Sequence, residues 1–134
     1  MLFRSERKGL QPVSIIVADI NDLRAINDKL GQVAGDALLR RAGEVFESLV
    51  ETPASIARIG GDEFAVLLPG TDAAGGEAVL HTLAELIELN NQYYPDVELS
   101  ISVGLATSQP GERLEQVAKR ADQNMLQVKQ LYQL

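Results

Sequence analysis

Three carboxylates lie at the ends of segments that the sequence predicts to be strands. Asp62 and Glu63 follow the paired glycines at positions 60–61, and Asp19 follows the apolar, β-branched run of residues 13–18. Two apolar segments that meet at paired glycines predict a β-hairpin, because glycine enters the positive-φ conformations of the favoured turns without steric cost. Acidic residues beside a turn are also common as plain solvated residues. The presence of Asp19 at the end of another predicted strand favours a functional site, since two strand ends can bring three carboxylates together.

The composition is that of one ordinary globular domain. The chain has 134 residues, of which 46% are hydrophobic and 23% are charged, and this length is enough for a single core. Its formal net charge of -7 argues against a surface for a nucleic-acid polymer, because such a surface must be basic. A single nucleotide needs only a local site.

The cellular setting is constrained by what the sequence lacks. There is no cysteine, so disulfides and thiolate metal sites are excluded and a reducing compartment is the natural interpretation. No apolar run approaches the roughly 20 residues of a membrane span, and residues 1–9 lack the apolar core of a signal peptide. We therefore expect one cytoplasmic domain over residues 1–134, without direct membrane contact and cut from a longer multidomain protein.

The apolar pattern predicts the element order β-α-α-β-β-α-β-α. Residues 13–18 form a near-continuous apolar run, as in a strand covered on both faces, whereas residues 97–105 alternate as in a strand with unlike faces. The other expected elements are hairpin strands at 55–59 and 63–68, and helices at 23–30, from Asp36 to Leu49, from Asp72 to Asn91, and from Leu114 to Val128. One hairpin inside alternating units predicts an α/β (α+β) fold, with a mixed, largely antiparallel central sheet flanked by helices.

Two aspartates, Asp36 and Asp72, are predicted helix N-caps, because each stands directly before an amphipathic segment. His81 is the only histidine, and it lies one place off the apolar stripe of its helix. We interpret it as a surface residue rather than a catalyst.

Residues 60–64, Gly-Gly-Asp-Glu-Phe, are the signature after which the GGDEF family of diguanylate cyclases is named. The first motif of that family is matched by residues 19–28 and 31–36, and shorter matches lie at 102–104 and 120–122. The chain thus resembles the family over nearly its whole length. The resemblance implies a fold similar to nucleotidyl-cyclase and polymerase palm domains, and condensation of two GTP molecules to cyclic di-GMP with release of pyrophosphate.

Divalent cations, Mg²⁺ or Mn²⁺, are the implied cofactors. Attack of a ribose 3′-hydroxyl on an α-phosphate needs them to neutralise the triphosphate and activate the nucleophile, and hard cations take oxygen ligands. The positions that match the family's metal ligands are Asp19, the backbone carbonyl of Ile20, Asp62 and Glu63. Asp62 also matches the residue proposed as general base, and the resemblance assigns Glu63 and Arg24 to catalysis with it.

The guanine base is assigned by the same resemblance to Asn27 and Asp36. A carboxylate that accepts from the ring N–H and the exocyclic amine selects guanine over adenine, because adenine offers an acceptor where guanine has that N–H. Two local interpretations stay open beside this one. Asp36 can be only a helix cap, and Asn27 only a polar residue at a helix end.

The triphosphate contacts are implied at two places. Backbone N–H groups of Asp22, Leu23 and Arg24 match the family's phosphate loop at a helix N-terminus, and Arg24 replaces the usual lysine with a planar fork of the same charge. Lys129 matches the residue that can meet the γ-phosphate. Residues 130–134 contain no arginine, whereas the family has one there, so either the chain is clipped or the triphosphate is held more weakly.

Several positions depart from the family pattern. Asn21, Leu23 and Gln32 replace Asp, Phe and His, and none of them is a matched metal ligand. The family's product-inhibition motif, Arg-x-x-Asp, is replaced by Glu-Thr-Pro-Ala at residues 51–54. Because Glu51 would repel phosphates rather than clamp them, we expect no inhibition by cyclic di-GMP through that site.

Two functions remain open. The first is an active cyclase that takes GTP and, because each chain presents one set of guanine and metal residues, works as a transient homodimer. The second is a catalytically weak or inactive GTP-binding module that controls an attached phosphodiesterase or other domain. Retention of both Asp62 and Glu63 favours the enzyme. In either case, a sensor or effector domain of the parent protein is an expected partner.

Overall fold

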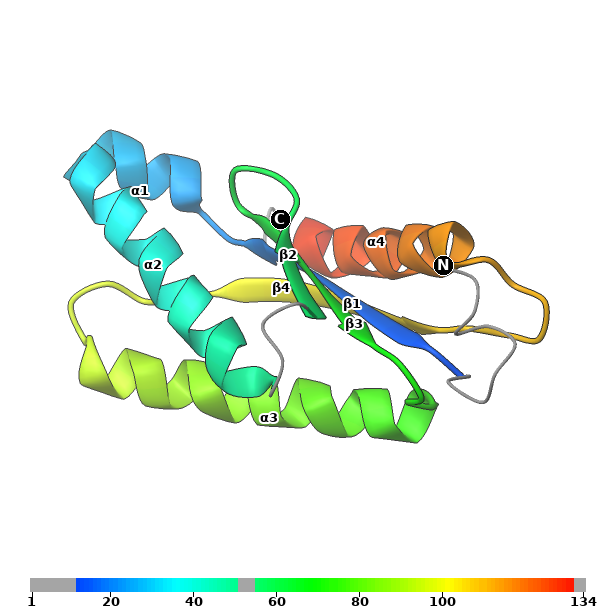
Figure 1. Cartoon of the computed structure of the whole chain (residues 1–134). Helices are drawn as coiled ribbons and strands as arrows, with labels where there is room; N and C mark the ends of the chain where they lie inside the picture. The colour runs from blue at the N-terminus through cyan, green and yellow to red at the C-terminus, as the bar shows by residue number, and fades with distance from the viewer. Residues whose placement is uncertain (1–11, 51–54, 132–134) are drawn as a thin grey trace.

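The computed structural model describes residues 12–50 and 55–131. In these parts of the chain, the elements follow the predicted order (Figure 1). They are β1 (Ser14–Ile20), α1 (Leu23–Leu30), α2 (Gln32–Leu49), β2 (Ile56–Arg58), β3 (Glu63–Leu68), α3 (Ala73–Tyr93), β4 (Ile101–Thr107) and α4 (Leu114–Leu131). No helix in the two described ranges is long and apolar enough to cross a bilayer.

The four described strands form one sheet in the order β2-β3-β1-β4, and every hydrogen-bonded pair is antiparallel. The sequence predicted a mixed sheet, and that detail is wrong for the described strands. The crossover through α1 and α2 does bring β2 back in the direction of β1, but β3 lies between them and pairs with both. This split βαβ arrangement therefore leaves no parallel pair in contact.

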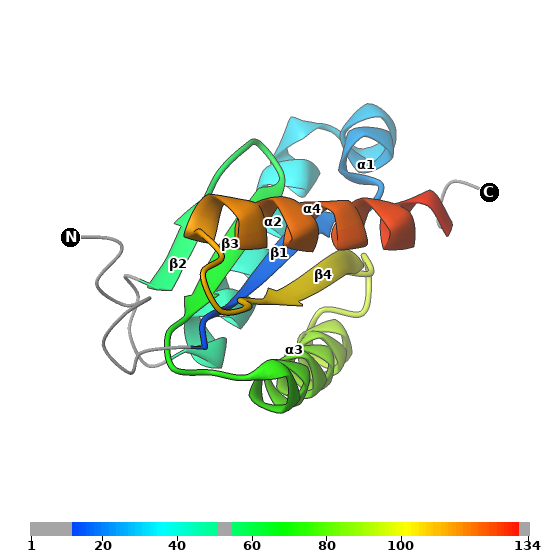
Figure 2. The same cartoon turned by 90° about the vertical axis from the view of Figure 1, so that its right-hand side faces the viewer.

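Helices cover both faces of the sheet (Figure 2), with α4 on one face and α2 and α3 on the other. The central strand β1 feeds both cores, because successive side chains of a strand point to opposite faces. Ile15 and Val17 pack toward α4, whereas Ile16 and Ala18 pack toward α2 and α3. The prediction of a strand covered on both faces is confirmed.

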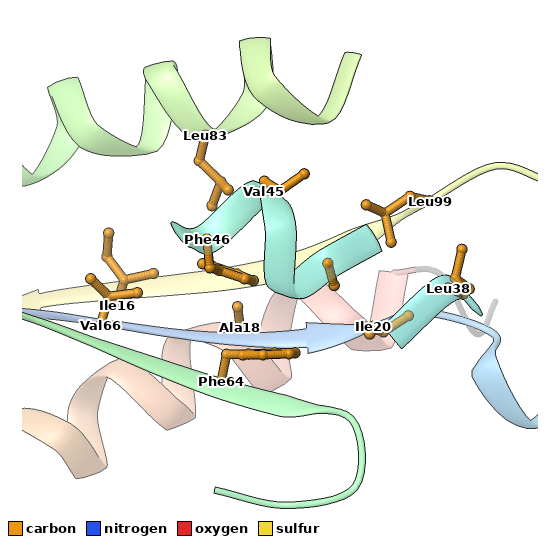
Figure 3. Close-up of a cluster of buried hydrophobic side chains, with 11 residues drawn as sticks. Ile16, Ala18, Ile20, Leu38, Val45, Phe46, Phe64, Val66, Leu83 and Leu99 are labelled. Carbon is orange, nitrogen blue, oxygen red and sulfur yellow. The ribbon is translucent and has the colours of Figure 1, made fainter. Parts of the chain in front are cut away.

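The core on the α2 and α3 face is built around two stacked rings (Figure 3). The ring centroids of Phe46 in α2 and Phe64 in β3 are 4.9 Å apart, and the ring planes differ by 21°. Phe64 is the last residue of the Gly-Gly-Asp-Glu-Phe signature. Its burial against Phe46 therefore fixes the position of the two carboxylates that precede it in the chain.

Helix α2 begins at Gln32, four residues before the predicted start, so Asp36 is not its N-cap. Gly31 ends α1 with φ of 94° and serves as the N-cap residue of α2 without a side-chain hydrogen bond. The carbonyl of Gly31 already accepts from Ala34 and Gly35, because the chain resumes helical geometry at once. Asp36 is exposed within the helix. The other predicted cap, Asp72, is confirmed, since its Oδ1 accepts from the Gly75 amide at 2.8 Å.

Strand β4 begins at Ile101 rather than at Val97. The backbone groups before Ile101 have other partners: Asn91 accepts from the Leu99 amide at 2.7 Å and donates to the Leu99 carbonyl at 3.0 Å. The buried Arg41 donates to the Val97 carbonyl at 2.6 Å. Side chains of α2 and α3 thus take the hydrogen bonds that a longer strand would have made.

The hairpin of β2 and β3 is confirmed, but its glycines do not act as expected. The positive-φ glycines of the described residues are Gly31, Gly70 and Gly111, and neither glycine at 60–61 is among them. The connection from Arg58 to Glu63 is longer than a two-residue turn, so it needs no mirror-image turn geometry. Arg58 instead donates to the carbonyls of both glycines, at 3.3 and 2.6 Å.

Candidate active site

The predicted carboxylates meet where β1 ends and β3 begins. In the antiparallel register, Asp19 of β1 lies opposite Glu63 of β3. The Ile20 amide donates to the Asp62 carbonyl at 3.0 Å, which joins the hairpin loop to the end of β1. Four predicted site residues, Asp19, Ile20, Asp62 and Glu63, are therefore brought together at one edge of the sheet.

Lys129 of α4 reaches this edge from the other end of the chain. Its Nζ lies 2.9 Å from Asp19 Oδ2 and donates to the Ile20 carbonyl at 3.3 Å. The ion pair is mostly buried, because the Lys129 side chain is 20% exposed and the Asp19 side chain 14%. Asp19 Oδ1 is buried and makes no hydrogen bond. A carboxylate oxygen without a partner is a position at which a ligand can bind.

The electrostatics of the edge follow from crowding of acidic groups. Burial raises the pKa of Asp19, the hydrogen bond from Lys129 lowers it, and the charge of Asp62 raises it again, with a net upward shift. Burial also raises the pKa of Glu63, and a hydrogen bond with Asp122 of α4 raises it further. A cation at this edge would relieve the repulsion, as Lys129 does in part.

Asp122 is a site residue that sequence reasoning did not assign. It lies in the 120–122 match to the family, but only the fold shows that it faces Glu63. The available signal was its spacing from Lys129. Seven residues are about two helical turns, so both side chains project from the same face of α4.

Asn21 is a second residue whose position the sequence left unexplained. It is 3% exposed, and its amide accepts from Ser102 Oγ at 2.8 Å and donates to Ser100 Oγ at 3.0 Å. Its backbone amide donates to the Ser100 carbonyl at 2.8 Å. These contacts hold the turn in which Asp22 adopts left-handed geometry, with φ of 62°, before α1 begins. An amide suits this buried place because it donates and accepts at once.

The predicted guanine residues lie apart from the carboxylates, on α1 and α2. Asn27 packs against Gly35, where a Cβ atom would overlap its Oδ1. That oxygen is buried without a hydrogen-bond partner, the condition expected for an acceptor that meets a ligand. Asp36 and Arg24 are exposed. Among the described residues, no hydrogen bond or ion pair links these three side chains to the carboxylate edge.

Two other predictions can be placed. His81 is a surface residue as predicted, with its side chain 80% exposed on α3. The substituted product-inhibition motif at residues 51–54 lies outside the described residues, and so does the end of the chain from 132 to 134.

Among the described residues, the donors at the carboxylate edge do not form a closed metal cage. Over residues 12–50 and 55–131, no group of three or more His, Cys, Asp or Glu side chains converges as a metal site. The donor set still fits a hard divalent cation, since it offers carboxylate oxygens and a backbone carbonyl. The partnerless Asp19 Oδ1 supports that fit.

A four-stranded antiparallel sheet with acidic residues at the shared edge of its central strands defines a palm-like domain. The sequence profile of the family described as "Diguanylate cyclase, GGDEF domain" matches residues 2–133. The chain belongs to this family, and the resemblance found in the sequence is confirmed.

The curated relatives are considerably longer than this chain. Diguanylate cyclase DgcS of Shewanella oneidensis is 31% identical over 129 residues, which cover 94% of this chain and 42% of the relative. Diguanylate cyclase DgcP of Pseudomonas aeruginosa is 37% identical over 118 residues, which cover 86% of this chain and 17% of the relative. The chain thus spans less than half the length of these relatives.

Solved structures share the fold. An EAL/GGDEF domain protein from M. capsulatus aligns with a TM-score of 0.76 and 32% identity, covering 96% of this chain and 87% of that one. The GGDEF domain of DgcB from Caulobacter crescentus, solved with c-di-GMP, has a TM-score of 0.78 and 26% identity, with 96% and 80% covered. SiaD from Pseudomonas aeruginosa, solved with its activator SiaC, has a TM-score of 0.79 and 26% identity, with 95% and 49% covered.

Proposed function

We propose that this domain is a diguanylate cyclase that condenses two GTP molecules to cyclic di-GMP and pyrophosphate in the cytoplasm. The observation that carries the proposal is the pairing of Asp19 with Glu63, beside an Asp19 Oδ1 that has no partner. Family membership supports it, because the curated relatives are named diguanylate cyclases.

In this proposal, Mg²⁺ or Mn²⁺ would be held by the carboxylates of Asp19, Asp62 and Glu63 and by the carbonyl of Ile20. The bound cation would neutralise the triphosphate and lower the pKa of the attacking 3′-hydroxyl. Asp62 accepts the proton of that hydroxyl as general base. Asp62 lies in the loop between β2 and β3, and Arg58 donates to two carbonyls of that loop. These hydrogen bonds help to keep the Asp62 carboxylate near the end of β1.

The nucleotide would lie along α1. Backbone N–H groups of Asp22, Leu23 and Arg24 at the start of α1 would donate to the phosphates. The Arg24 side chain would add positive charge where the leaving pyrophosphate carries negative charge. Asn27 and Asp36 would read the guanine edge, and the partnerless Asn27 Oδ1 supports that assignment.

Two chains must meet for the reaction, because each domain offers one set of guanine and metal residues. At saturating GTP, the initial rate should rise with roughly the square of protein concentration in the dilute range, where the dimer population obeys mass action. The parent protein would control this encounter through a sensor or effector domain. The greater length of the relatives and the activator bound to SiaD support such control.

The decisive experiment is incubation with GTP and Mg²⁺ and identification of the product by mass. The wild-type domain should yield cyclic di-GMP, and Asp62→Asn should abolish it while the fold survives, because a loop carboxylate contributes little to packing. Glu88→Gln on the exposed face of α3 removes one negative charge elsewhere and should leave the rate unchanged. Unchanged turnover in Asp62→Asn would refute the assignment.

A GTP-binding regulatory module is the second candidate, and one observation favours it. Lys129 already neutralises Asp19 in the nucleotide-free chain. GTP binding without any product, at all protein concentrations and also in the full-length protein, would support this alternative.

A further inference from the structure

Lys129 is held in its place by the packing of α4. Met125, one turn earlier on the same helical face, is 1% exposed in the core between α4 and β1. The α4 backbone touches β4 at Gly104, where a Cβ atom would overlap the Ala121 carbonyl and the Met125 amide. This close contact fixes the distance between α4 and the sheet, and so it fixes the position from which the Lys129 side chain extends to Asp19.

The ammonium group of Lys129 binds two oxygens that the proposed function gives to the metal. Its contacts are Asp19 Oδ2 at 2.9 Å and the Ile20 carbonyl at 3.3 Å. A divalent cation on these oxygens would lie roughly 2.0–2.6 Å from each of them. The ammonium and the metal cannot share the same pair, because two cations at such short separation repel strongly in a partly buried site.

We propose that Lys129 is a tethered cation that holds the metal position while the domain is free of nucleotide, and that metal binding displaces it. This inference rests on the proposed function. The displaced ammonium group has lost its partners and is then free to meet the triphosphate. Metal binding thereby prepares the phosphate contact, and by thermodynamic reciprocity a bound triphosphate that attracts Lys129 makes the metal bind more tightly.

Repulsion among the acidic side chains explains why a tethered cation would be useful at this edge. Asp19, Asp62, Glu63 and Asp122 influence one another at this edge, and repulsion among them would be strongest when no cation is bound. Lys129 supplies one positive charge in that state and leaves the buried Asp19 Oδ1 without a hydrogen bond. A metal that displaces Lys129 can therefore bind both oxygens of the Asp19 carboxylate.

Chemical labelling of lysines tests the displacement in the wild-type protein. The domain is treated with an amine-acylating reagent, with and without Mn²⁺ and in the absence of nucleotide, and the labelling rate of each lysine is read by peptide mass spectrometry. Mn²⁺ should raise the labelling rate of Lys129 by about fivefold or more, the lower range of coupling between two ligands. Lys119, exposed on the same helix, is the internal control and should not change.

A titration with Mn²⁺ tests the competition. Lys129→Met should bind Mn²⁺ about tenfold more tightly than wild type without nucleotide, because the metal no longer displaces a charge-assisted hydrogen bond. Lys119→Met is the matched control and should bind as wild type does. In Lys129→Met, the gain in metal affinity that a non-hydrolysable GTP analogue produces should also be smaller. Circular dichroism of each variant confirms that the fold survives, and Lys129→Gln replaces Lys129→Met if the latter does not fold.

The outcomes separate this inference from the proposed function. If Mn²⁺ binds but Lys129 labelling stays constant and Lys129→Met binds no more tightly, Lys129 is a structural ion pair and the exchange is wrong, while the cyclase assignment stands. If no variant binds Mn²⁺, both the exchange and the metal site fail. Cyclic di-GMP production then decides separately whether the domain is a cyclase.

Discussion

Helices α1 and α4 both carry residues assigned to GTP, yet they are attached to the fold in different ways. Helix α4 buries Leu114, Val117, Ala121 and Met125 against the sheet. Helix α1 has eight residues, none of them buried, and its N-cap Asp22 makes no side-chain cap hydrogen bond. Lys129 therefore projects from a helix that is packed into the core, whereas Asn27 lies on a lightly anchored helix.

This difference suggests a division of work. Catalytic oxygens and cations must be held accurately, so they belong on elements fixed by packing. Residues that bind the base can shift when the ligand arrives, because hydrogen bonds to the ligand then fix their side chains. We infer that Lys129 and the carboxylates are placed before GTP arrives, and that Asn27 reaches its final position with GTP bound.

The largest effect is expected where α4 touches β4. Gly104→Ala should destabilise the domain by about 3 kcal/mol, since the new Cβ would overlap backbone atoms of Ala121 and Met125, which cannot rotate away. Gly43→Ala in α2 is the matched control, because nothing lies within 4 Å of its Cβ position, and it should stabilise the helix by about 0.5–1 kcal/mol. Urea denaturation measures both. Equal stabilities would show that α4 is not fixed by this contact.

A glycine-to-alanine substitution at Gly35, which packs against Asn27 of α1, should change GTP binding rather than the stability of the fold. A Cβ at Gly35 would overlap only the end of the Asn27 side chain, which can move, so Gly35→Ala should leave stability nearly unchanged. GTP affinity should fall about tenfold, which corresponds to one hydrogen bond to a ligand. Calorimetric titration checks this, again beside Gly43→Ala. Unaltered affinity would remove Asn27 from the binding site.

A smaller effect on stability is expected at Asp72, the N-cap of α3, compared with Asp36 inside α2. Asp72→Ala should cost about 1 kcal/mol, because the Gly75 amide loses its cap acceptor. Asp36→Ala should change stability by less than about 0.5 kcal/mol, as expected for an exposed residue inside a helix. If Asp36 reads guanine, its variant should instead lose preference for GTP over ATP in a competition titration. Comparable losses of stability in the two variants would contradict the cap assignment.

The smallest measurable loss of stability is expected at the ion pair of Arg120 and Glu112, which joins α4 to the loop before it. Arg120 donates to both carboxylate oxygens, at 2.8 and 2.6 Å, and this hydrogen bonding lowers the pKa of Glu112. A lowered pKa in the folded state stabilises the fold above the unfolded pKa, and the benefit disappears as pH falls through the folded pKa. Glu112→Gln should therefore cost about 0.5 kcal/mol near neutral pH.

Thermal melts over a pH series measure that difference, which should vanish in acid. The exposed Glu88→Gln variant serves as the control and should show no such loss at neutral pH. A loss that persists at low pH would mean that Glu112 acts through packing and not through charge.

Much of the fold could be predicted because its signals are local. The apolar run of β1 and the Asp72 cap depend on neighbouring residues, and the structure confirms both. The start of β4 could not be predicted, since alternation at 97–105 does not show that Arg41 and Asn91 take the backbone hydrogen bonds of the first residues. Asp36 was misplaced because a cap residue resembles any exposed aspartate unless the helix start is known.

The resemblance assigned residues to the candidate site but not the contacts between them. The resemblance assigned Asp19, Asp62 and Glu63, and the sheet register brings Asp19 and Glu63 side by side. The ion pair between Lys129 and Asp19 and the contact of Asp122 with Glu63 join remote parts of the chain. The spacing of Asp122 and Lys129 puts them on one face of α4, but it does not show which strand residues they meet.

The position of β1 in the middle of the sheet bears on synthesis of the protein. Asn21 is bonded to a serine 81 residues later, and Ile20 accepts from a lysine 109 residues later. Contacts of such long range form late, because the loop between the partners must close first. An incomplete chain on the ribosome therefore lacks β4, α4 and the lysine that neutralises Asp19. Asp19 thus gains its neutralising partner only after α4 has been translated.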